Sequence, residues 1–395
     1  MRVSIIGQGY VGLTIAVSAA RAGHTVLGLD VKESLIAQLS AGKSHIEGIS
    51  DVALAGLVAT GRYVASTDPS VLEGSDVIVI AVPTPLDKER NPDLSFVHAA
   101  ADLIATNVKS AALVVNESTS YPGTLRKEIA ARITSVAHLY ASSPERVDPG
   151  NTQWGTKNTP RLIGGLTPDA VSKAKKFYST FCDTVIEVSS PEVAEAAKIF
   201  ENTFRQVNIA LVNEFAQIAD ALGISGREVL DAAATKPYGF MEFNPGPGVG
   251  GHCIPVDPSY LAHVANEVGV PATFIKRANE VNLAMPAYVV KRVVAGGGSI
   301  KDKKVVVVGV SYKSNVADTR ETPAAGVIDL LREQGATVTW HDDLVGSWRG
   351  ETSTPINGAD IAVLVTKHDG LDLAELKSCG YIFDCTGTVA GADGI

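Results

Sequence analysis

The residue of this chain with the most specific chemistry is a cysteine in a glycine- and proline-rich segment. Cys253 lies in residues 250–259, which read GGHCIPVDPS. A thiol attacks carbon as a thiolate, so a catalytic cysteine needs polar surroundings and a backbone that substrate can approach. The preceding glycines could supply the approach, and Asp257 follows one helical turn later. This pattern indicates a covalent catalyst, although a buried structural cysteine in a Pro/Gly loop has the same local sequence.

A lysine and an asparagine one helical turn apart form a second group with catalytic potential. Lys198 and Asn202 follow the helix-start signal SSPE at 189–192, and no helix breaker occurs before Gly223. This predicts a helix of about thirty residues, roughly 45 Å long. Lys198, Asn202 and Arg205 lie on the side of this helix opposite an apolar stripe. Lys198 and Asn202 could stabilise an oxyanion, although a solvated helix face has the same pattern. The stripe consists of Val193, Phe200, Phe204, Val207, Leu211, Phe215, Ile218 and Leu222.

The amino-terminal segment has the pattern of a dinucleotide-binding site. An apolar run at 1–6 leads into GQGYVG at 7–12 and then into an alanine-rich helical stretch. Glycines in such a turn let the backbone approach a pyrophosphate, and the helix N-terminus attracts its negative charge. A second apolar run, 25–29, ends at Asp30. An acid there bonds the ribose 2'-hydroxyl and repels a 2'-phosphate, so the sequence predicts NAD as the cofactor.

Three further strand-like runs precede polar loops that could line the same site. The runs at 77–82, 113–116 and 138–142 alternate with helical segments, as in a doubly wound parallel sheet. The carboxyl ends of such strands meet at one edge of the sheet, where ligands bind. The loops are VPTP at 82–85, ESTSYPGT at 117–124 and SPER at 143–146.

A second nucleotide-type domain follows GGGS at 296–299, which is a linker signal. A strand at 303–309, a helix at 323–334 and a strand at 337–340 that ends at HDD repeat the amino-terminal pattern without its triple glycine. Lys313 and Arg320 could meet a phosphate there, although surface charge is the default for either alone. We predict an α/β protein with two Rossmann-like, doubly wound parallel-sheet domains joined by a long central helix and a helical dimerisation region. The predicted boundaries are 1–188, 189–295 and 296–395.

The composition is typical of a large cytoplasmic α/β protein. The 395 residues are 45% hydrophobic and 19% charged, with a formal net charge of −9. This charge disfavours a nucleic-acid or anionic-membrane surface. No signal peptide or membrane-spanning segment is predicted. The four cysteines, Cys182, Cys253, Cys379 and Cys385, lack metal-type spacing, so we expect reduced thiols and no metal site.

Seven ordered motifs of the chain resemble those of one known family. The chain is similar, over nearly its whole length, to the nucleotide-sugar 6-dehydrogenases of the UDP-glucose/GDP-mannose dehydrogenase family. The resemblance implies an NAD-dependent four-electron oxidation of a sugar C6 alcohol to a carboxylate, through an enzyme-held aldehyde and a cysteine thioester. It also implies a homodimer built across the central helix. The motifs are GQGYVG at 7–12, VPTP at 82–85, EST at 117–119, SPER at 143–146, Lys198 with Asn202, GGHC at 250–253 and residues 313–320.

The resemblance also implies roles for individual residues. Cys253 would attack the aldehyde, Lys198 and Asn202 would stabilise the alkoxide and the oxyanion, and Glu145 would be the base in thioester hydrolysis. The matched catalytic positions are Cys253, Lys198, Asn202, Glu145, Thr119 and Asp257. The matched cofactor positions are Gly7, Gly9, Tyr10, Val11, Gly12, Asp30, Thr84, Thr119 and Arg320. The matched substrate positions are Glu145, Arg146, Val147, Lys198, Asn202, Phe243, Gly246, Gly250, Lys313 and Arg320.

The expected substrate is a UDP-N-acetylhexosamine. ATKPYGFM at 234–241 and FNPGPG at 243–248 resemble that branch of the family, and Val256 stands where the glucose branch usually carries lysine. We expect UDP-N-acetylglucosamine, with UDP-N-acetylmannosamine the nearest alternative and UDP-glucose a third. A β-hydroxyacid dehydrogenase would share the first domain and the Lys/Asn pair but would need no thiol. A non-catalytic NAD-binding protein would share only the fold.

Overall fold

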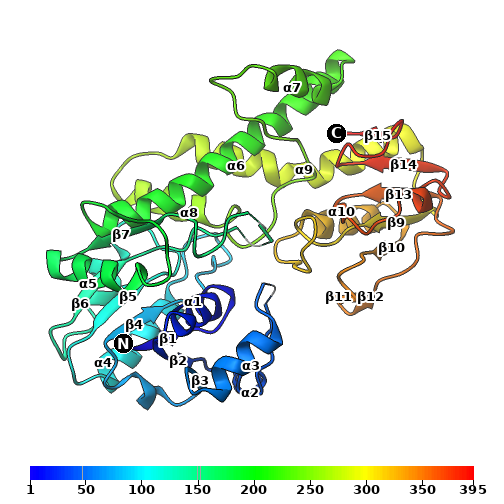
Figure 1. Cartoon of the computed structure of the whole chain (residues 1–395). Helices are drawn as coiled ribbons and strands as arrows, with labels where there is room; N and C mark the ends of the chain where they lie inside the picture. Colours follow the sequence, from blue (N-terminus) through cyan, green and yellow to red (C-terminus); the bar gives the residue numbers. More distant parts are fainter. Residues whose placement is uncertain (47, 149, 152) are drawn as a thin grey trace. The chain divides into compact units, whose positions relative to one another are not determined.

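The computed structural model describes residues 1–46, 48–148, 150–151 and 153–395. These residues form two compact units, one of residues 1–201 and 259–269 and the other of residues 202–258 and 270–395. Helices α6 (Pro191–Leu222) and α8 (Asp257–Glu267) contribute residues to both units. Each unit contains one large sheet (Figure 1).

The first unit is built on an eight-stranded sheet with the order β3-β2-β1-β4-β5-β6-β7-β8. All neighbouring strands are parallel except β6 and β7, which are antiparallel. The five strands predicted here correspond to β1, β2, β4, β5 and β6, whereas β3, β7 and β8 were not predicted. The strands are β1 (Arg2–Ile6), β2 (Thr25–Leu29), β3 (Tyr63–Ser66), β4 (Val77–Ile80), β5 (Leu113–Asn116), β6 (Leu139–Ser142), β7 (Arg161–Gly165) and β8 (Val185–Glu187).

Both faces of this sheet are buried, as expected for strands with continuous apolar runs. One face packs on α1 (Tyr10–Arg21) and α5 (Pro168–Tyr178) through Val3, Ile5, Val77, Val79, Leu113 and Val115. The residues between them point to the opposite face, where Ile6, Ile78, Ile80 and Val114 are also buried. The remaining helices of the unit are α2 (Glu33–Ser40), α3 (Asp51–Ala59), η1 (Pro69–Leu72), α4 (Ser95–Asn107) and η2 (Leu125–Ala130).

Helix α6 confirms the predicted long helix, because its 32 residues run without a break to the residue before Gly223. Much of its apolar stripe is exposed, although Val207 packs against a small cluster of Ala210, Ala278 and Val281. Phe200, Leu211 and Leu222 are 64%, 62% and 67% exposed, whereas Lys198, on the other side, is 8% exposed. The side of α6 that carries Lys198 is therefore not a solvated face at Lys198, which is buried. It is solvated at Arg205, which is exposed.

The second unit is built on the sheet β10-β9-β13-β14-β15, in which all neighbours are parallel. Its core contains Val305, Val307, Trp340, Val363 and Phe383, together with residues of α9 and α10. The strands are β9 (Lys304–Val308), β10 (Thr337–His341), β13 (Ile361–Leu364), β14 (Tyr381–Asp384) and β15 (Asp393–Gly394), beside a small hairpin of β11 (Ser347–Trp348) and β12 (Glu351–Thr352). The helices are α7 (Gly226–Ala234), α9 (Thr273–Gly297), α10 (Pro323–Glu333) and α11 (Leu373–Leu376).

The predicted linker is partly helical. Helix α9 continues through Gly297, and Gly298, with φ +75°, ends it. A Cβ on Gly296 would lie 2.1 Å from the hydroxyl of Tyr381, and one on Gly297 would lie 2.9 Å from the same ring. These glycines therefore allow α9 to pack closely on β14, and their presence does not indicate a flexible connection here.

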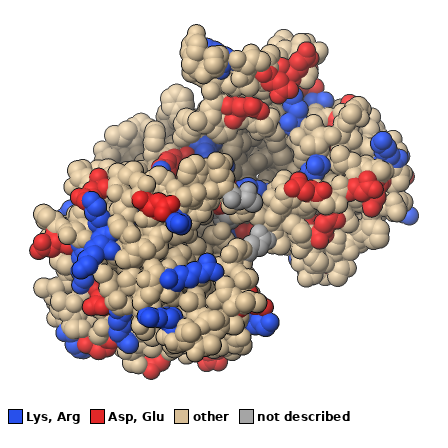
Figure 2. Space-filling view, in the orientation of Figure 1, with Lys and Arg blue, Asp and Glu red and all other residues tan. Residues whose placement is uncertain are grey.

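Acidic and basic side chains are interspersed over the face of the molecule drawn in Figure 2. The formal net charge of −9 is therefore not gathered into one acidic field on that face.

Candidate active site

The glycine loop at 7–12 fits a dinucleotide. Gly7 has φ +91°, and a Cβ there would lie 2.3 Å from the carbonyl oxygen of Ala81. A Cβ on Gly12 would lie 1.8 Å from the carbonyl oxygen of Gly7, so this glycine lets α1 approach the turn. Gly9 caps α1 without a side chain, which leaves the first helical N–H groups accessible to a phosphate. Tyr10 and Val11 open the helix and are half-buried.

Asp30 lies at the end of β2 and holds this loop. Its carboxylate accepts hydrogen bonds from the N–H of Gln8 at 2.8 Å and of Lys32 at 3.0 Å. The side chain is half-buried, so it retains an accessible edge that can accept a ribose hydroxyl. Thr84, in contrast, is only 1% exposed, because it lies beneath the surface of the loop after β4.

Replacing Asp30 with asparagine is expected to lower the preference for NAD over NADP by roughly tenfold, because it removes the charge that repels a 2'-phosphate. The measurement is kcat/KM for each cofactor at one substrate concentration. Glu33→Gln is the control, since Glu33 is an exposed acid at the start of α2. An unchanged cofactor preference in Asp30→Asn would contradict this role.

The lysine of α6 meets the loop after β5. Lys198 donates through Nζ to Oγ1 of Thr119 at 2.5 Å, and both side chains are buried. Among the described residues no carboxylate forms an ion pair with Lys198. A buried ammonium beside a neutral hydroxyl can stabilise a negative charge that develops on substrate.

Glu195, one turn before Lys198, anchors the same loop to α6 and was missed in the sequence. Its carboxylate accepts hydrogen bonds from the N–H groups of Gly123 at 2.8 Å and Leu125 at 2.9 Å. Burial raises the pKa of Glu195 to about 7, although these backbone donors oppose the rise. The contact positions Thr119 against Lys198, and the only signal in the sequence was an acid on the side of a helix that also carries Lys198.

Glu145, after β6, is held by three donors. Its Oε1 accepts the N–H groups of Arg146 at 2.7 Å and Val147 at 2.9 Å, and its Oε2 accepts Nη2 of Arg161 at 2.6 Å. Burial would raise the pKa of Glu145, but Arg161 and the backbone donors outweigh it and hold the pKa below its usual value. Arg146 itself is paired with Glu201 at 2.6 Å. The predicted positions Glu145, Arg146 and Val147 therefore form one connected cluster.

The second unit holds Cys253 close to two other predicted positions. Asn202 donates to Oδ2 of Asp257 at 2.6 Å, and the N–H of Asp257 donates to the carbonyl oxygen of Cys253 at 2.8 Å. Asp257 is fully buried at the start of α8, whereas Cys253 is exposed. The other three cysteines are buried, so Cys253 is the thiol of the described chain that a solvent-borne substrate can reach.

The glycines before Cys253 allow close packing against Tyr312. They do not form the open path for substrate that was expected from the sequence. A Cβ on Gly250 would lie 2.7 Å from Cβ of Tyr312, and one on Gly251 would lie 2.7 Å from the Tyr312 ring. The N–H of Gly251 donates to the carbonyl oxygen of Arg320 at 2.9 Å. The hydrogen bond to Asp318 is the main cause that raises the pKa of Arg320. Cys253 also contributes to this rise, because the guanidinium lies within electrostatic range of the thiol.

The other predicted substrate positions also lie in the second unit. The ring of Phe243 packs on Phe204 with a centroid distance of 6.0 Å, and the N–H of Gly246 donates to Oδ1 of Asn213 at 2.9 Å. Lys313 is half-buried in the loop after β9. Arg320 is exposed and pairs with Asp318 at 2.6 Å.

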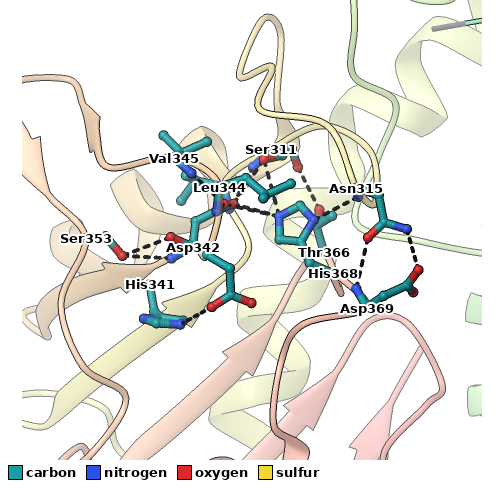
Figure 3. A network of polar contacts seen from close by, with 12 residues as sticks. Ser311, Asn315, His341, Asp342, Leu344, Val345, Ser353, Thr366, His368 and Asp369 are labelled. Carbon is teal, nitrogen blue, oxygen red and sulfur yellow. Dashed lines mark hydrogen bonds and ion pairs between the residues drawn. The ribbon is translucent and has the colours of Figure 1, made fainter. Parts of the chain in front are cut away.

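A buried network behind this loop explains why the second domain differs from the first (Figure 3). Asp342, at the end of β10, accepts hydrogen bonds from the N–H of Val310 at 2.8 Å, Oγ of Ser311 at 3.0 Å and Nε2 of His368 at 3.1 Å. Burial would raise the pKa of Asp342, but His368 and the N–H donors hold it well below its usual range. Its position matches that of Asp30, yet it is 4% exposed. The Asp342 carboxylate is therefore buried and occupied by hydrogen bonds within the protein, so it cannot bind a ribose.

The Ser311, His368 and Asp342 side chains do not form a nucleophilic triad. Nδ1 of His368 accepts the N–H of Asn315 at 2.8 Å, and Oγ of Ser311 donates to Asp342 (Figure 3). Since Ser311 is fully buried, the network positions the loop of Lys313 and has no access to substrate.

A glycine turn followed by an acid at the end of β2, a second Rossmann-like domain and a buried lysine are typical of NAD-dependent dehydrogenases with two nucleotide-binding domains. Comparison with known families identifies the chain more narrowly. Its residues 1–182, 192–284 and 306–390 match the NAD-binding, central and UDP-binding domains of the UDP-glucose/GDP-mannose dehydrogenase family. The chain belongs to this family of oxidoreductases, which confirms the predicted family, fold class and cofactor.

The relatives cover nearly the whole chain. A UDP-N-acetyl-D-mannosamine dehydrogenase of Methanococcus maripaludis is 37% identical, over 93% of this chain and 86% of the relative. An NDP-N-acetyl-D-galactosaminuronic acid dehydrogenase of Ralstonia nicotianae is 34% identical, over 95% of this chain and 93% of the relative. The solved structure of a UDP-D-ManNAc dehydrogenase from Pyrococcus horikoshii matches with a TM-score of 0.90 and 31% identity, covering 100% of this chain and 99% of that one. In the described part of this chain, no helix is long and apolar enough to cross a membrane.

Proposed function

We propose that this protein oxidises C6 of a UDP-N-acetylhexosamine to the carboxylate in two successive two-electron steps, with Cys253 as the covalent catalyst. The observation that carries the proposal is the exposure of Cys253 beside the Asn202–Asp257 pair, in a chain whose other cysteines are buried. A family member that made only the aldehyde would have no use for an accessible thiol at this position.

In this proposal, each of the candidate residues has a separate catalytic role. Bound NAD, with Asp30 at its ribose, supplies the hydride acceptor for each oxidation. Lys198, supported by Thr119, stabilises the C6 alkoxide after the alcohol proton is lost to solvent, and loss of a hydride from C6 to the cofactor would then give the aldehyde. The Cys253 thiolate then adds to the aldehyde carbon to form a thiohemiacetal, which becomes a thioester when its C6 hydride leaves. Water attacks the thioester carbon and its proton goes to Glu145; the C–S bond then breaks, which releases the C6 carboxylate and the Cys253 thiolate.

The preferred sugar is UDP-N-acetylmannosamine. The sequence favoured UDP-N-acetylglucosamine, but relatives named for the mannosamine substrate are 34–37% identical and cover at least 93% of this chain. The glucosamine and galactosamine isomers differ from it only in configuration at one or two ring carbons, so they stay alternatives that the same experiment separates.

The experiment is the ratio of NADH formed to nucleotide sugar consumed, measured separately with UDP-N-acetylmannosamine, UDP-N-acetylglucosamine, UDP-N-acetylgalactosamine and UDP-glucose. Two NADH per UDP-N-acetylmannosamine are expected. A ratio of one would indicate a simple alcohol dehydrogenase, as for a β-hydroxyacid dehydrogenase, and would remove the role of Cys253. No NADH with any nucleotide sugar would favour a non-catalytic NAD-binding protein.

We also propose a homodimer that covers the apolar stripe of α6. The exposed fractions of Phe204, Leu211, Ile218 and Leu222 are 41%, 62%, 48% and 67%, which is unusual for side chains aligned on one helix face. Sedimentation equilibrium tests this assembly, and a monomer at micromolar concentration would contradict it.

A further inference from the structure

A buried arginine bridges two carboxylates behind the proposed hydrolytic base. Arg161, on β7, donates to Oε2 of Glu145 at 2.6 Å and lies 3.0 Å from Oε2 of Glu117. The side chains of Arg161, Glu117 and Glu145 are 3%, 0% and 8% exposed. The hydroxyl of Tyr178 donates to the other oxygen of Glu117 at 2.5 Å, and the guanidinium lies 4.7 Å from the centre of the Tyr178 ring. The cluster belongs entirely to the first unit.

The charges in this cluster do not balance when both carboxylates are ionised. Two negative groups share one guanidinium in a water-excluded environment, where a surplus charge is costly. Burial raises the pKa of Glu117 to about 7, against the opposing effect of Arg161. The groups that face the cluster from neighbouring elements are Tyr178 at the end of α5, Cys182 after it, Ser143 after β6, and Arg146 with Glu201 of α6. Arg146 and Glu201 neutralise each other, so the charge of Arg161 is shared by Glu117 and Glu145.

The geometry makes the two carboxylates competitors for one cation. Glu145 keeps its two backbone donors in either state, so its orientation is constant and only the strength of the Arg161 contact can change. When Glu117 is neutral, the positive charge of Arg161 stabilises only the Glu145 carboxylate. This lowers the pKa of Glu145 and makes it a weaker base. When Glu117 is ionised, Arg161 is divided between the two, and Glu145 accepts a proton more readily.

We propose that Arg161 is a positioning residue for Glu145, and that the protonation state of Glu117 decides how tightly Arg161 holds it. The inference rests on the proposed function in one respect, because it takes Glu145 as the base that receives the proton of the hydrolytic water. Neither Arg161 nor Glu117 touches substrate in this scheme. Both residues act through Glu145, because they change its basicity.

The test is the pH dependence of thioester hydrolysis in the full-length enzyme. UDP-N-acetylmannosamine and NAD are mixed with the enzyme, samples are quenched in acid, and the Cys253 acyl-enzyme is followed by intact-protein mass spectrometry from pH 6 to pH 8. In the wild type, hydrolysis is expected to accelerate by roughly threefold to tenfold as Glu117 ionises near pH 7. Glu117→Gln, which keeps the shape of the side chain, is expected to hold the slower rate and to lose this rise.

The controls separate positioning from folding. Arg161→Gln is expected to move the acidic limb of the hydrolysis profile to higher pH, because burial then raises the pKa of Glu145 without opposition from the guanidinium. Glu192→Gln removes a carboxylate from an exposed arginine pair of the same unit, Arg126–Glu192, and is expected to keep the wild-type profile. A wild-type rise that persists in Glu117→Gln would overturn the proposal.

A second measurement does not depend on catalysis. Since the pKa of Glu117 is raised in the folded state from 4.5 to about 7, the native protein binds the extra proton below pH 7. This contribution to stability is fully present below the unfolded pKa and is lost as the pH rises through 7. The difference in Tm between the wild type and Glu117→Gln is therefore expected to change from pH 5 to pH 8. If no sugar yields NADH but this change is seen, the proposed function fails while the raised pKa of Glu117 stands; a constant difference would mean that Glu117 does not change its charge near pH 7, which would overturn the inference.

Discussion

Replacement of Cys253 by alanine is expected to abolish turnover of the nucleotide sugar, with kcat falling at least about 10³-fold. The second oxidation needs a tetrahedral adduct from which hydride can leave, and alanine offers no atom to form it. The measurement is NADH formation by absorbance together with identification of the sugar product by mass spectrometry. Cys253→Ser is expected to be nearly as inactive, because an alcohol at this position is a much poorer nucleophile than a thiolate.

Cys379→Ala is the matched control for this experiment. Cys379 is a buried cysteine of the same unit, and burial raises the pKa of its thiol, so it is inert. This variant is expected to keep kcat within about twofold of the wild type and to lose some thermal stability. Wild-type rates in Cys253→Ala would remove the thioester from the mechanism and leave a single-hydride dehydrogenase.

Replacement of Lys198 by methionine is expected to lower kcat by about 10²–10³-fold with a smaller change in KM. Methionine fills the same space on α6 but has no charge to stabilise an alkoxide. Because the ammonium is buried beside Thr119 and has no carboxylate partner among the described residues, its charge is available to the substrate. Stopped-flow measurement of the first NADH formed isolates the hydride step from product release.

Two variants separate the charge of Lys198 from its contact with Thr119. Arg205→Met removes an exposed cation from the same helix and is expected to leave kcat unchanged within about twofold. Thr119→Val removes the hydroxyl partner but keeps the ammonium, so its loss is expected to be smaller than that of Lys198→Met. Equal losses in Thr119→Val and Lys198→Met would mean that Lys198 acts only by holding the Thr119 loop.

The two Rossmann-like domains use an equivalent acid in different ways. Asp30 and Asp342 each end the second strand of a domain and each bind an N–H of the first turn, that of Gln8 and that of Val310. Asp30 keeps an accessible edge, whereas His368 and Ser311 cover Asp342. The loop after β9, which binds and covers Asp342 through Val310 and Ser311, also carries Lys313, a cation suited to phosphate.

Much of the fold could be predicted from local patterns. The glycine turn at 7–12, Asp30 and the span of α6 follow from short-range rules: the steric need of Gly7 for a positive φ, strand alternation and the absence of helix breakers. The motifs also predicted the family and identified Cys253 as the candidate thiol, whereas its exposure is known only from the structure. Strand β8 was missed because it has only three residues and is largely exposed. Strand β7, which carries Arg161, was missed because its sequence RLIGG has only two consecutive apolar side chains between an arginine and two glycines.

Local sequence patterns are enough to predict the long helix, the cofactor loop and the candidates Lys198, Asn202, Glu145 and Cys253. The contacts that hold those candidates follow from the packing of distant segments. Glu117, Glu145 and Arg161 come from three separate segments, and their contact depends on the register of β5, β6 and β7. The burial of Lys198 and the packing of Gly250 on Tyr312 also depend on long-range contacts. Local periodicity reports which side of an element is apolar, but the partner of each side, and hence the charge state of a buried group, is set by which distant segments the fold brings against it.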